Sequence, residues 1–169
     1  PSAHTRAVIS AGHNAFERVR SMFTAAVITV SDKGSQGDRK DLSAPVIEEL
    51  VKSIGGEVAA YAVVPDEQAL LEEKLKEYAD EKSLDLVFTT GGTGFSPRDV
   101  TPEATLAVVD RLAPGIAEAM RWNSLKITPK AMLSRAVAGI RGATLIINLP
   151  GSPKAVRECL EMIIPALPH

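Results

Sequence analysis

Several features that mark specialised classes of protein are missing from this chain of 169 residues. It has one cysteine, Cys159, so an internal disulfide is excluded, and this suits a reducing cytosol. The formal net charge is −2, so no basic surface for nucleic acid is indicated. No apolar run is long enough to span a membrane. The sequence therefore predicts a cytoplasmic globular protein that binds neither nucleic acid nor a membrane.

The two common glycine signatures of nucleotide sites are missing as well. The GGTG sequence of Gly91–Gly94 differs from the G-x-G-x-x-G dinucleotide fingerprint, and no Gly-Lys-Ser/Thr follows it as in a P-loop. An apolar run at 84–88 precedes it. Thr101 and Pro102 follow it, which predicts a helix with Thr101 as N-cap and Pro102 at the first helical position. The turn could bring backbone N–H groups close to a phosphate, or it could simply require positive φ.

Alternating apolar patterns predict an α/β fold. Strands are expected at 23–30, 58–64, 84–88 and 143–149, and helices at 43–54, 67–82, 101–111, 114–124 and after 153. Residues 125–141 are expected to be irregular or partly helical. The element order predicts three layers, with a mostly parallel sheet covered by helices on both faces. Residues 1–21 fit this pattern poorly, so we interpret them as a non-native or upstream extension and 22–169 as a single domain.

Polar or Gly/Pro-rich segments follow all four expected strands, at 31–41, 65–66, 91–99 and 150–153. Since the carboxyl ends of parallel strands share one edge of a sheet, we expect these segments to form one ligand site. Asp66 and Asp99 lie in two of them and could hold Mg²⁺ on a nucleotide phosphate, or accept protons. Alternatively, Asp66 caps the next helix, and Asp99 caps a turn or pairs with Arg98. The residues alone thus predict a phosphate- or anion-binding domain with a metal-assisted reaction.

Four further positions have a functional and a structural interpretation. The Ser134-Arg135 pair could bind a ligand or form a surface turn. Ser152 could belong to an anion site or act as the N-cap of the last helix, with Pro153 at its first position. Trp122 is interpreted as a core or interface residue rather than a stacking platform. Cys159 lies among apolar residues and is interpreted as a buried structural thiol.

Longer stretches of the chain, taken together, are similar to a known family. They are TVSD at 29–32, VVPDE at 63–67, TTGGTGF at 89–95, PRDVTPEAT at 97–105, SLKITP at 124–129, MLSRAVAGIRG at 132–142 and TLIINLPGSPKA at 144–155. In this order and spacing the chain, from Phe23 to its end, resembles the molybdopterin adenylyltransferases. These include the Mog-type bacterial proteins, the G domain of gephyrin and that of its plant counterpart. Matched blocks of this length are far more specific than a lone motif.

The resemblance implies an activity in molybdenum cofactor biosynthesis. The family transfers AMP from Mg-ATP to the terminal phosphate of molybdopterin, which gives adenylyl-molybdopterin and pyrophosphate. ATP would be the co-substrate and Mg²⁺ the cofactor. The resemblance further implies a homotrimer and a downstream molybdenum insertase as partner. Two alternatives stay open, namely a non-catalytic molybdopterin-binding protein of the same fold and a scaffold like the gephyrin domain.

The same resemblance assigns site residues. Asp66 and Asp99 would be the essential carboxylates and the Mg²⁺ ligands. The residues expected to bind molybdopterin or ATP are Ser31, Asp32, Asp41, Gly91, Gly92, Thr93, Gly94, Ser96, Arg98, Thr101, Pro102, Glu103, Ser134, Pro150, Gly151 and Ser152. Those up to Asp41 would lie on the nucleotide side, and the glycine turn, Ser134 and the 150–153 loop would line the pocket for the pterin and phosphates. Ala44 replaces the glycine of the family's D-x-S-G-P pattern, which puts the loop geometry near Asp41 in question.

Overall fold

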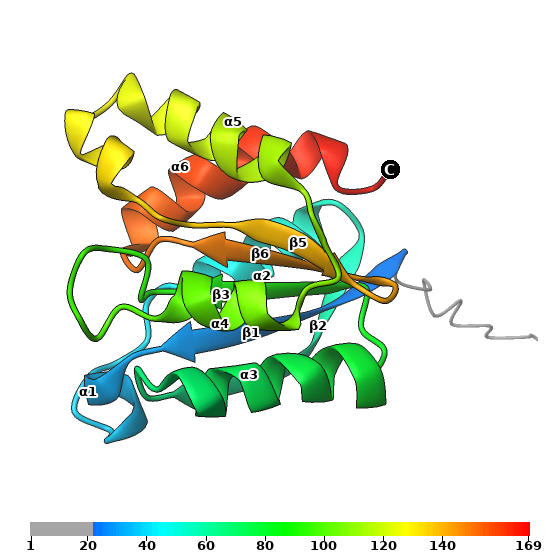
Figure 1. Ribbon diagram of the computed structural model, residues 1–169. Coiled ribbons are helices and arrows are strands. Elements are labelled where there is room, and N and C mark those ends of the chain that lie inside the picture. Colours follow the sequence, from blue (N-terminus) through cyan, green and yellow to red (C-terminus); the bar gives the residue numbers. More distant parts are fainter. Residues whose placement is uncertain (1–21) are drawn as a thin grey trace, which may run out of the picture.

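The computed structural model describes residues 22–169, and the interpretation of 1–21 as an extension lies outside this part. Residues 22–169 form one six-stranded sheet in the order β2-β1-β3-β6-β5-β4 (Figure 1). The strands are β1 (Phe23–Val30), β2 (Gly56–Val64), β3 (Leu86–Thr90), β4 (Arg111–Leu112), β5 (Ala138–Arg141) and β6 (Thr144–Leu149). The first four strands in spatial order are parallel, and β5 runs antiparallel to both of its neighbours, β6 and β4. The expected mostly parallel α/β sheet is confirmed.

Helices cover both faces of this sheet, so the fold has three layers (Figure 1). They are α1 (Asp32–Ser35), α2 (Ala44–Ser53), α3 (Gln68–Lys76), the π-helical η1 (Glu77–Glu81), α4 (Thr101–Val108), α5 (Pro114–Leu125), the 3₁₀ turn η2 (Pro129–Leu133), α6 (Pro153–Ile163) and the 3₁₀ turn η3 (Ile164–Ala166). Within residues 22–169, none of these has the length and apolar character needed to cross a bilayer.

Alternating side chains of the buried strands feed two separate cores. On β1, Ala25 and Val27 face the core formed with α2, α5 and α6, which includes Cys159. Their neighbours Ala26 and Ile28 face the core formed with α3 and α4. This period of two is the geometry of a strand with both faces covered. The expected burial of Cys159 is confirmed, whereas Trp122 is 60% exposed and is therefore not a core residue.

The structure corrects the expected elements at the antiparallel edge. Residues 125–141 contain strand β5 as well as η2, and the helix expected over 101–111 ends at Val108 so that Arg111 and Leu112 can form β4. Gly139 allows this pairing, because a Cβ there would lie 2.9 Å from the carbonyl oxygen of Arg111. Short antiparallel strands are stabilised by their partners more than by their own residues, so local pattern does not reveal them.

The two expected helix starts differ in outcome. Ser152 is the N-cap of α6, and its side chain accepts a hydrogen bond from the N–H of Ala155 at 3.2 Å, as expected. Thr101 is not an N-cap, since α4 begins with it. Its hydroxyl donates instead to the carbonyl of Gly91 at 2.9 Å. The threonine therefore ties α4 to the glycine turn rather than satisfying the helix's own N–H groups.

Candidate active site

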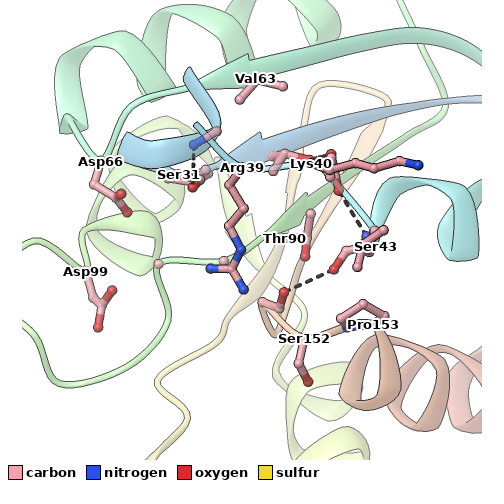
Figure 2. A pocket seen from close by; sticks show the side chains of 18 residues that line it. Ser31, Arg39, Lys40, Ser43, Val63, Asp66, Thr90, Asp99, Ser152 and Pro153 are labelled. Atoms are coloured by element: carbon pink, nitrogen blue, oxygen red, sulfur yellow. Dashed lines mark hydrogen bonds between the residues drawn. The ribbon is translucent and has the colours of Figure 1, made fainter. Parts of the chain in front are cut away.

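A cavity of about 400 Å³ lies at the carboxyl ends of the four parallel strands (Figure 2). Each of the four loops expected at this edge contributes to its lining, through Ser31 and Asp41 after β1, Asp66 after β2, Gly91, Gly92 and Asp99 after β3, and Gly151 and Ser152 after β6. The expectation that the four loops meet is therefore confirmed. The geometry follows from the parallel register, because strands that run in the same direction end at the same edge.

The glycine turn is shaped by close approach of the backbone. Gly91 and Gly92 have positive φ, at +96° and +70°. A Cβ on Gly91 would lie 2.6 Å from the carbonyl oxygen of Val30, and one on Gly92 would lie 2.3 Å from the hydroxyl oxygen of Thr101. The structural interpretation of the turn, a need for positive φ, is confirmed. Both glycines lie at the wall of the cavity, where the N–H of Gly91 donates to the carbonyl of Leu149 at 3.2 Å and the N–H of Gly92 has no acceptor within residues 22–169. The N–H of Gly92 is therefore the one of the two that an anion could use.

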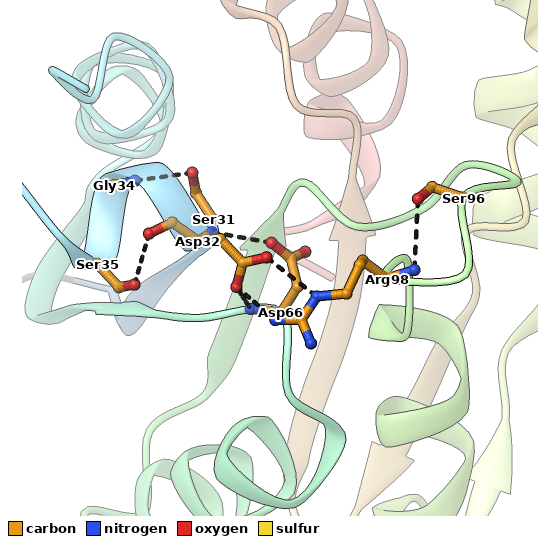
Figure 3. A network of polar contacts seen from close by, with 7 residues as sticks. All are labelled: Ser31, Asp32, Gly34, Ser35, Asp66, Ser96 and Arg98. Atoms are coloured by element: carbon orange, nitrogen blue, oxygen red, sulfur yellow. Dashed lines mark hydrogen bonds and ion pairs between the residues drawn. The ribbon is translucent and has the colours of Figure 1, made fainter. Parts of the chain in front are cut away.

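Asp32 and Asp66 hold the first two loops together (Figure 3). The N–H of Asp32 donates to Oδ2 of Asp66, and the N–H of Asp66 donates to Oδ1 of Asp32, both at 2.9 Å. The expected cap role of Asp66 toward the following helix is wrong, because the N-cap of α3 is Glu67 and makes no side-chain cap. Burial raises the pKa of Asp66 above its ordinary value. The N–H of Asp32 lowers it in part, and the charges of Asp32 and Asp99 raise it further.

Arg98 extends this network to the third loop. Its Nε and Nη2 donate to the two carboxylate oxygens of Asp32 at 3.1 and 2.7 Å (Figure 3). The alternative that Arg98 pairs with Asp99 is therefore wrong. The hydrogen bonds from Arg98 and from the N–H of Asp66 hold the pKa of Asp32 below its ordinary value. Such a two-pronged contact fixes orientation as well as charge, so it links the loop after β1 to the loop that contains Asp99.

Asp99 closes a turn of its own, as one of the interpretations expected. Its Oδ2 accepts the N–H of Ser96 at 3.0 Å. Among residues 22–169, Oδ1 of Asp99 and Oδ1 of Asp66 accept no hydrogen bond. Asp66 and Asp99 thus each retain one oxygen for a ligand. Within the same part of the chain no group of three or more His, Cys, Asp or Glu side chains is suited to a metal, so a cation here would need phosphate or water oxygens as well.

Asp41 is a structural residue of the cavity wall. Its carboxylate accepts hydrogen bonds from the hydroxyls of Thr29 and Tyr61 and from the N–H groups of Ser43 and Ala44. Burial raises the pKa of Asp41, but these hydrogen bonds outweigh it and hold the pKa below its ordinary value. Ala44 lies in the first turn of α2 without positive φ, so the missing glycine leaves the loop intact.

Known proteins share this sequence and fold. Residues 26–169 match the family described as "Probable molybdopterin binding domain". The chain belongs to this molybdopterin-binding family. The molybdopterin adenylyltransferase of Helicobacter pylori (strain J99) is 48% identical over 145 residues, which cover 85% of this chain and 82% of that protein. The Escherichia coli K12 protein of the same name is 48% identical over 137 residues, covering 80% and 70%. The structure of the molybdopterin biosynthesis enzyme MoaB from Thermus thermophilus has a TM-score of 0.83 and 53% identity, covering 87% of this chain and 92% of that one.

This family member has a second cavity, of about 300 Å³. Four of the expected site residues line it, namely Thr93, Gly94, Ser134 and Pro150. Met120, Ala131, Leu133 and Ala136 give it a largely apolar wall. The glycine turn therefore separates two hollows, with Gly91 and Gly92 on one side and Thr93 and Gly94 on the other. The structure brings these four residues together, but not into the cavity that contains the two carboxylates.

Six expected site residues line neither cavity. These are Asp32, Ser96, Arg98, Thr101, Pro102 and Glu103. Thr101 and Pro102 are buried in the first turn of α4, and Glu103 forms an ion pair with Arg135. The side chain of Ser96 accepts the N–H of Arg98 at 3.3 Å. All of these residues except Pro102 make the loop or helix contacts described here, and none of the six lines either cavity.

Sequence reasoning missed the cations of the first cavity. Arg39 and Lys40 line it, and Figure 2 shows the guanidinium of Arg39 projecting into it. No carboxylate or carbonyl within residues 22–169 is hydrogen-bonded to either side chain. Both belong to the polar segment between β1 and α2, which has no regular spacing of apolar residues to indicate where its side chains point. The only signal was two adjacent cations in the polar segment that follows a parallel strand.

Proposed function

We propose that this protein is a molybdopterin adenylyltransferase, which transfers AMP from ATP to the terminal phosphate of molybdopterin and releases pyrophosphate. The observation that carries the proposal is that Asp66 and Asp99, from loops after β2 and β3, line one cavity and each keep a free carboxylate oxygen. Relatives at 48% identity bear the name of this activity. A molybdopterin carrier without catalysis would have no need for two carboxylates that repel each other.

The reaction depends more on offsetting the negative charge of the phosphates than on a strong general base. The nucleophile is a phosphate oxygen of molybdopterin that is already anionic. It attacks the α-phosphorus of ATP, a new P–O bond forms, and the bond to the bridging oxygen of the β-phosphate breaks. Both reactants are polyanions, so cations and N–H groups must offset their repulsion. Arg39 and Lys40 are the cations that line the cavity, and Gly92 adds a backbone N–H that donates to no group within residues 22–169.

Asp66 and Asp99 fit a magnesium ion that arrives with ATP. Mg²⁺ binds one or two carboxylates and completes its shell with phosphate and water oxygens, and the two free oxygens supply that number. When bound, it would reduce the charge on the phosphates. Asp32 binds the guanidinium of Arg98, so Arg98 donates to neither of the two free oxygens.

We assign the two cavities to the two substrates. The first has the cations and carboxylates that suit the triphosphate and nucleotide. The second has an apolar wall with Ser134 at its edge, which suits a flat heterocycle with a few polar groups. The reacting phosphates would then meet over the glycine turn that both cavities share. The same family likeness predicts a homotrimer, a downstream molybdenum insertase and a cytoplasmic location, and these stay predictions.

The test is a direct search for the product. The protein is incubated with molybdopterin, ATP and Mg²⁺, and adenylyl-molybdopterin and pyrophosphate are measured by mass spectrometry and a coupled assay. Asp66→Asn and Asp99→Asn should each lose at least about 100-fold in rate. Asp110→Asn is the matched control, because Asp110 only accepts the N–H of Gly142 outside both cavities. Tight molybdopterin binding by the wild type without any adduct would favour the carrier alternative.

A further inference from the structure

Arg135 lies between the two cavities without lining either. It follows Ser134 in the segment that joins η2 to β5. Its backbone N–H donates to the carbonyl of Thr93 at 2.9 Å. Its side chain reaches the loop that contains Asp99, a contact that neither sequence interpretation, a ligand contact or a surface turn, included.

The guanidinium of Arg135 binds that loop at two points and the helix that follows it at a third. Nε donates to the carbonyl of Gly94 at 2.8 Å, and Nη2 donates to the carbonyl of Asp99 itself at 2.8 Å. Nη1 forms an ion pair with Glu103 in the first turn of α4. A guanidinium is planar and its donors are fixed relative to one another, so the three acceptors are fixed relative to one another too.

The other contacts of the loop hold its first residues and a turn within it: the Thr101 hydroxyl donates to the carbonyl of Gly91, and the N–H of Ser96 donates to Oδ2 of Asp99. Residues 95–98 are exposed, and no helix or strand occurs between Thr90 and Thr101. Within the described part of the chain, the side-chain contact that joins residues 95–98 to another loop is the ion pair of Arg98 with Asp32, between two partly exposed groups that solvent screens. The hydrogen bonds from Arg135 to the carbonyls of Gly94 and Asp99 do not need a charged acceptor, unlike the ion pair of Arg98. One of them holds the peptide of Asp99 itself.

We propose that Arg135 is a positioning residue that sets where the carboxylate of Asp99 lies in the first cavity. It does so by holding the peptide of Asp99, together with the residues before and after it, against the segment that lines the second cavity. The structural part stands on the contacts alone. The catalytic consequence rests on the proposed function, in which Asp99 is essential.

The closing experiment combines Arg135→Gln, Arg135→Lys and a control, Arg141→Gln. Arg141 makes a similar set of contacts, a two-pronged pair with Asp80 and a bond to the carbonyl of Val108, at the opposite edge of the sheet. Hydrogen–deuterium exchange of the free protein is followed over 93–103. Exchange should be faster in Arg135→Gln and unchanged there in Arg141→Gln. Equal protection in Arg135→Gln and wild type would overturn the proposal, whatever the activity.

Kinetics then tests the route through Asp99. Arg135→Gln should lower kcat about 100-fold with little change in KM for ATP, because a small misplacement of a reacting-site group has that cost. Arg135→Lys, which keeps the charge but not the fork, should recover part of it. In the Asp99→Asn background Arg135→Gln should have no further effect. A multiplicative loss there, or a raised KM with normal kcat, would overturn the proposal.

The outcomes also separate this proposal from the proposed function. If the wild type forms no adenylyl adduct but the loop exchanges faster in Arg135→Gln, the function is wrong and the positioning contact is supported. If the wild type is active and exchange over 93–103 is unaffected, the function stands and the positioning role fails. If Arg135→Gln does not fold, Arg135→Lys provides both readouts.

Discussion

Asp32 and Asp66 each accept the other's backbone N–H at 2.9 Å, so two acidic side chains are locked side by side across the ends of β1 and β2. Arg98 balances one of the two charges, that of Asp32. Asp66 forms no ion pair within residues 22–169, and Asp99 lines the same cavity. Burial and the charges of Asp32 and Asp99 therefore raise the pKa of Asp66. Keeping Asp66 ionised in the cavity therefore lowers the free energy of unfolding.

Asp66→Asn should therefore stabilise the protein. A carboxyl whose pKa is raised on folding binds its proton more tightly when folded, so ionisation above the unfolded pKa costs stability. We expect the melting temperature at pH 7 to rise by about 2–4 °C while activity is lost, as at other sites where function opposes stability. Thermal melts between pH 3 and 7 check this. The gain should shrink as the pH falls toward the unfolded pKa, and a lower melting temperature at pH 7 would contradict the prediction.

The turn at Gly92 should tolerate no side chain. Gly92→Ala combines a left-handed residue with a Cβ placed 2.3 Å from the Thr101 hydroxyl, so we expect a loss of about 3 kcal/mol. Gly142→Ala is the control, because Gly142 also has positive φ, at +57°, but has nothing within 4 Å of the added atom. It should lose about 1 kcal/mol, from backbone strain alone. Urea titration of both variants measures the difference, and equal losses would show that the contact with Thr101 is unimportant.

Asp41 should matter for stability more than for chemistry. Asp41→Asn loses charge-assisted hydrogen bonds from hydroxyl and N–H donors, at a cost of about 2 kcal/mol. Since its pKa is lowered on folding, its contribution is present above the unfolded pKa and is lost as the pH falls through the folded pKa. Denaturant titrations at pH 7 and pH 3 should show a difference between wild type and variant that narrows in acid. Tyr61→Phe, which removes one donor, should cost less, and a greater loss would contradict this account.

Local signals explain which parts of the fold were predictable. A few consecutive residues suffice to predict the apolar strands β1 and β6 and the start of α6 at Ser152-Pro153. The structure confirms all three. Strand β5 could not be foreseen, because AGIR forms a strand only against its neighbours.

The candidate site also has parts that the sequence predicts and parts that depend on residues distant in the chain. That Asp66 and Asp99 share an edge followed from parallel topology. The partner of Arg98 could not be foreseen, since Asp32 lies 66 residues away and Asp99 is adjacent in sequence. Sequence distance is a poor guide to pairing wherever several loops meet, and the fork of Arg135 was hidden for the same reason.

Arg39 is expected to be the arginine that meets the phosphates. The two arginines near Asp66 differ in availability, because Arg98 is engaged by Asp32 and Arg39 has no partner within residues 22–169 (Figure 2). A free guanidinium can bind a phosphate without first giving up another contact. Arg39→Gln should therefore raise the KM for ATP about tenfold and make nucleotide binding less sensitive to salt.

The control for Arg39 is Lys33→Gln, a cation in α1 that does not line the cavity. It should leave the KM for ATP within about twofold of wild type. Isothermal titration with a non-hydrolysable ATP analogue, at two salt concentrations, separates binding from turnover. If Arg98→Gln weakens nucleotide binding more than Arg39→Gln does, then Arg98 leaves Asp32 when the substrate arrives, and the pairing seen here belongs to the free protein only.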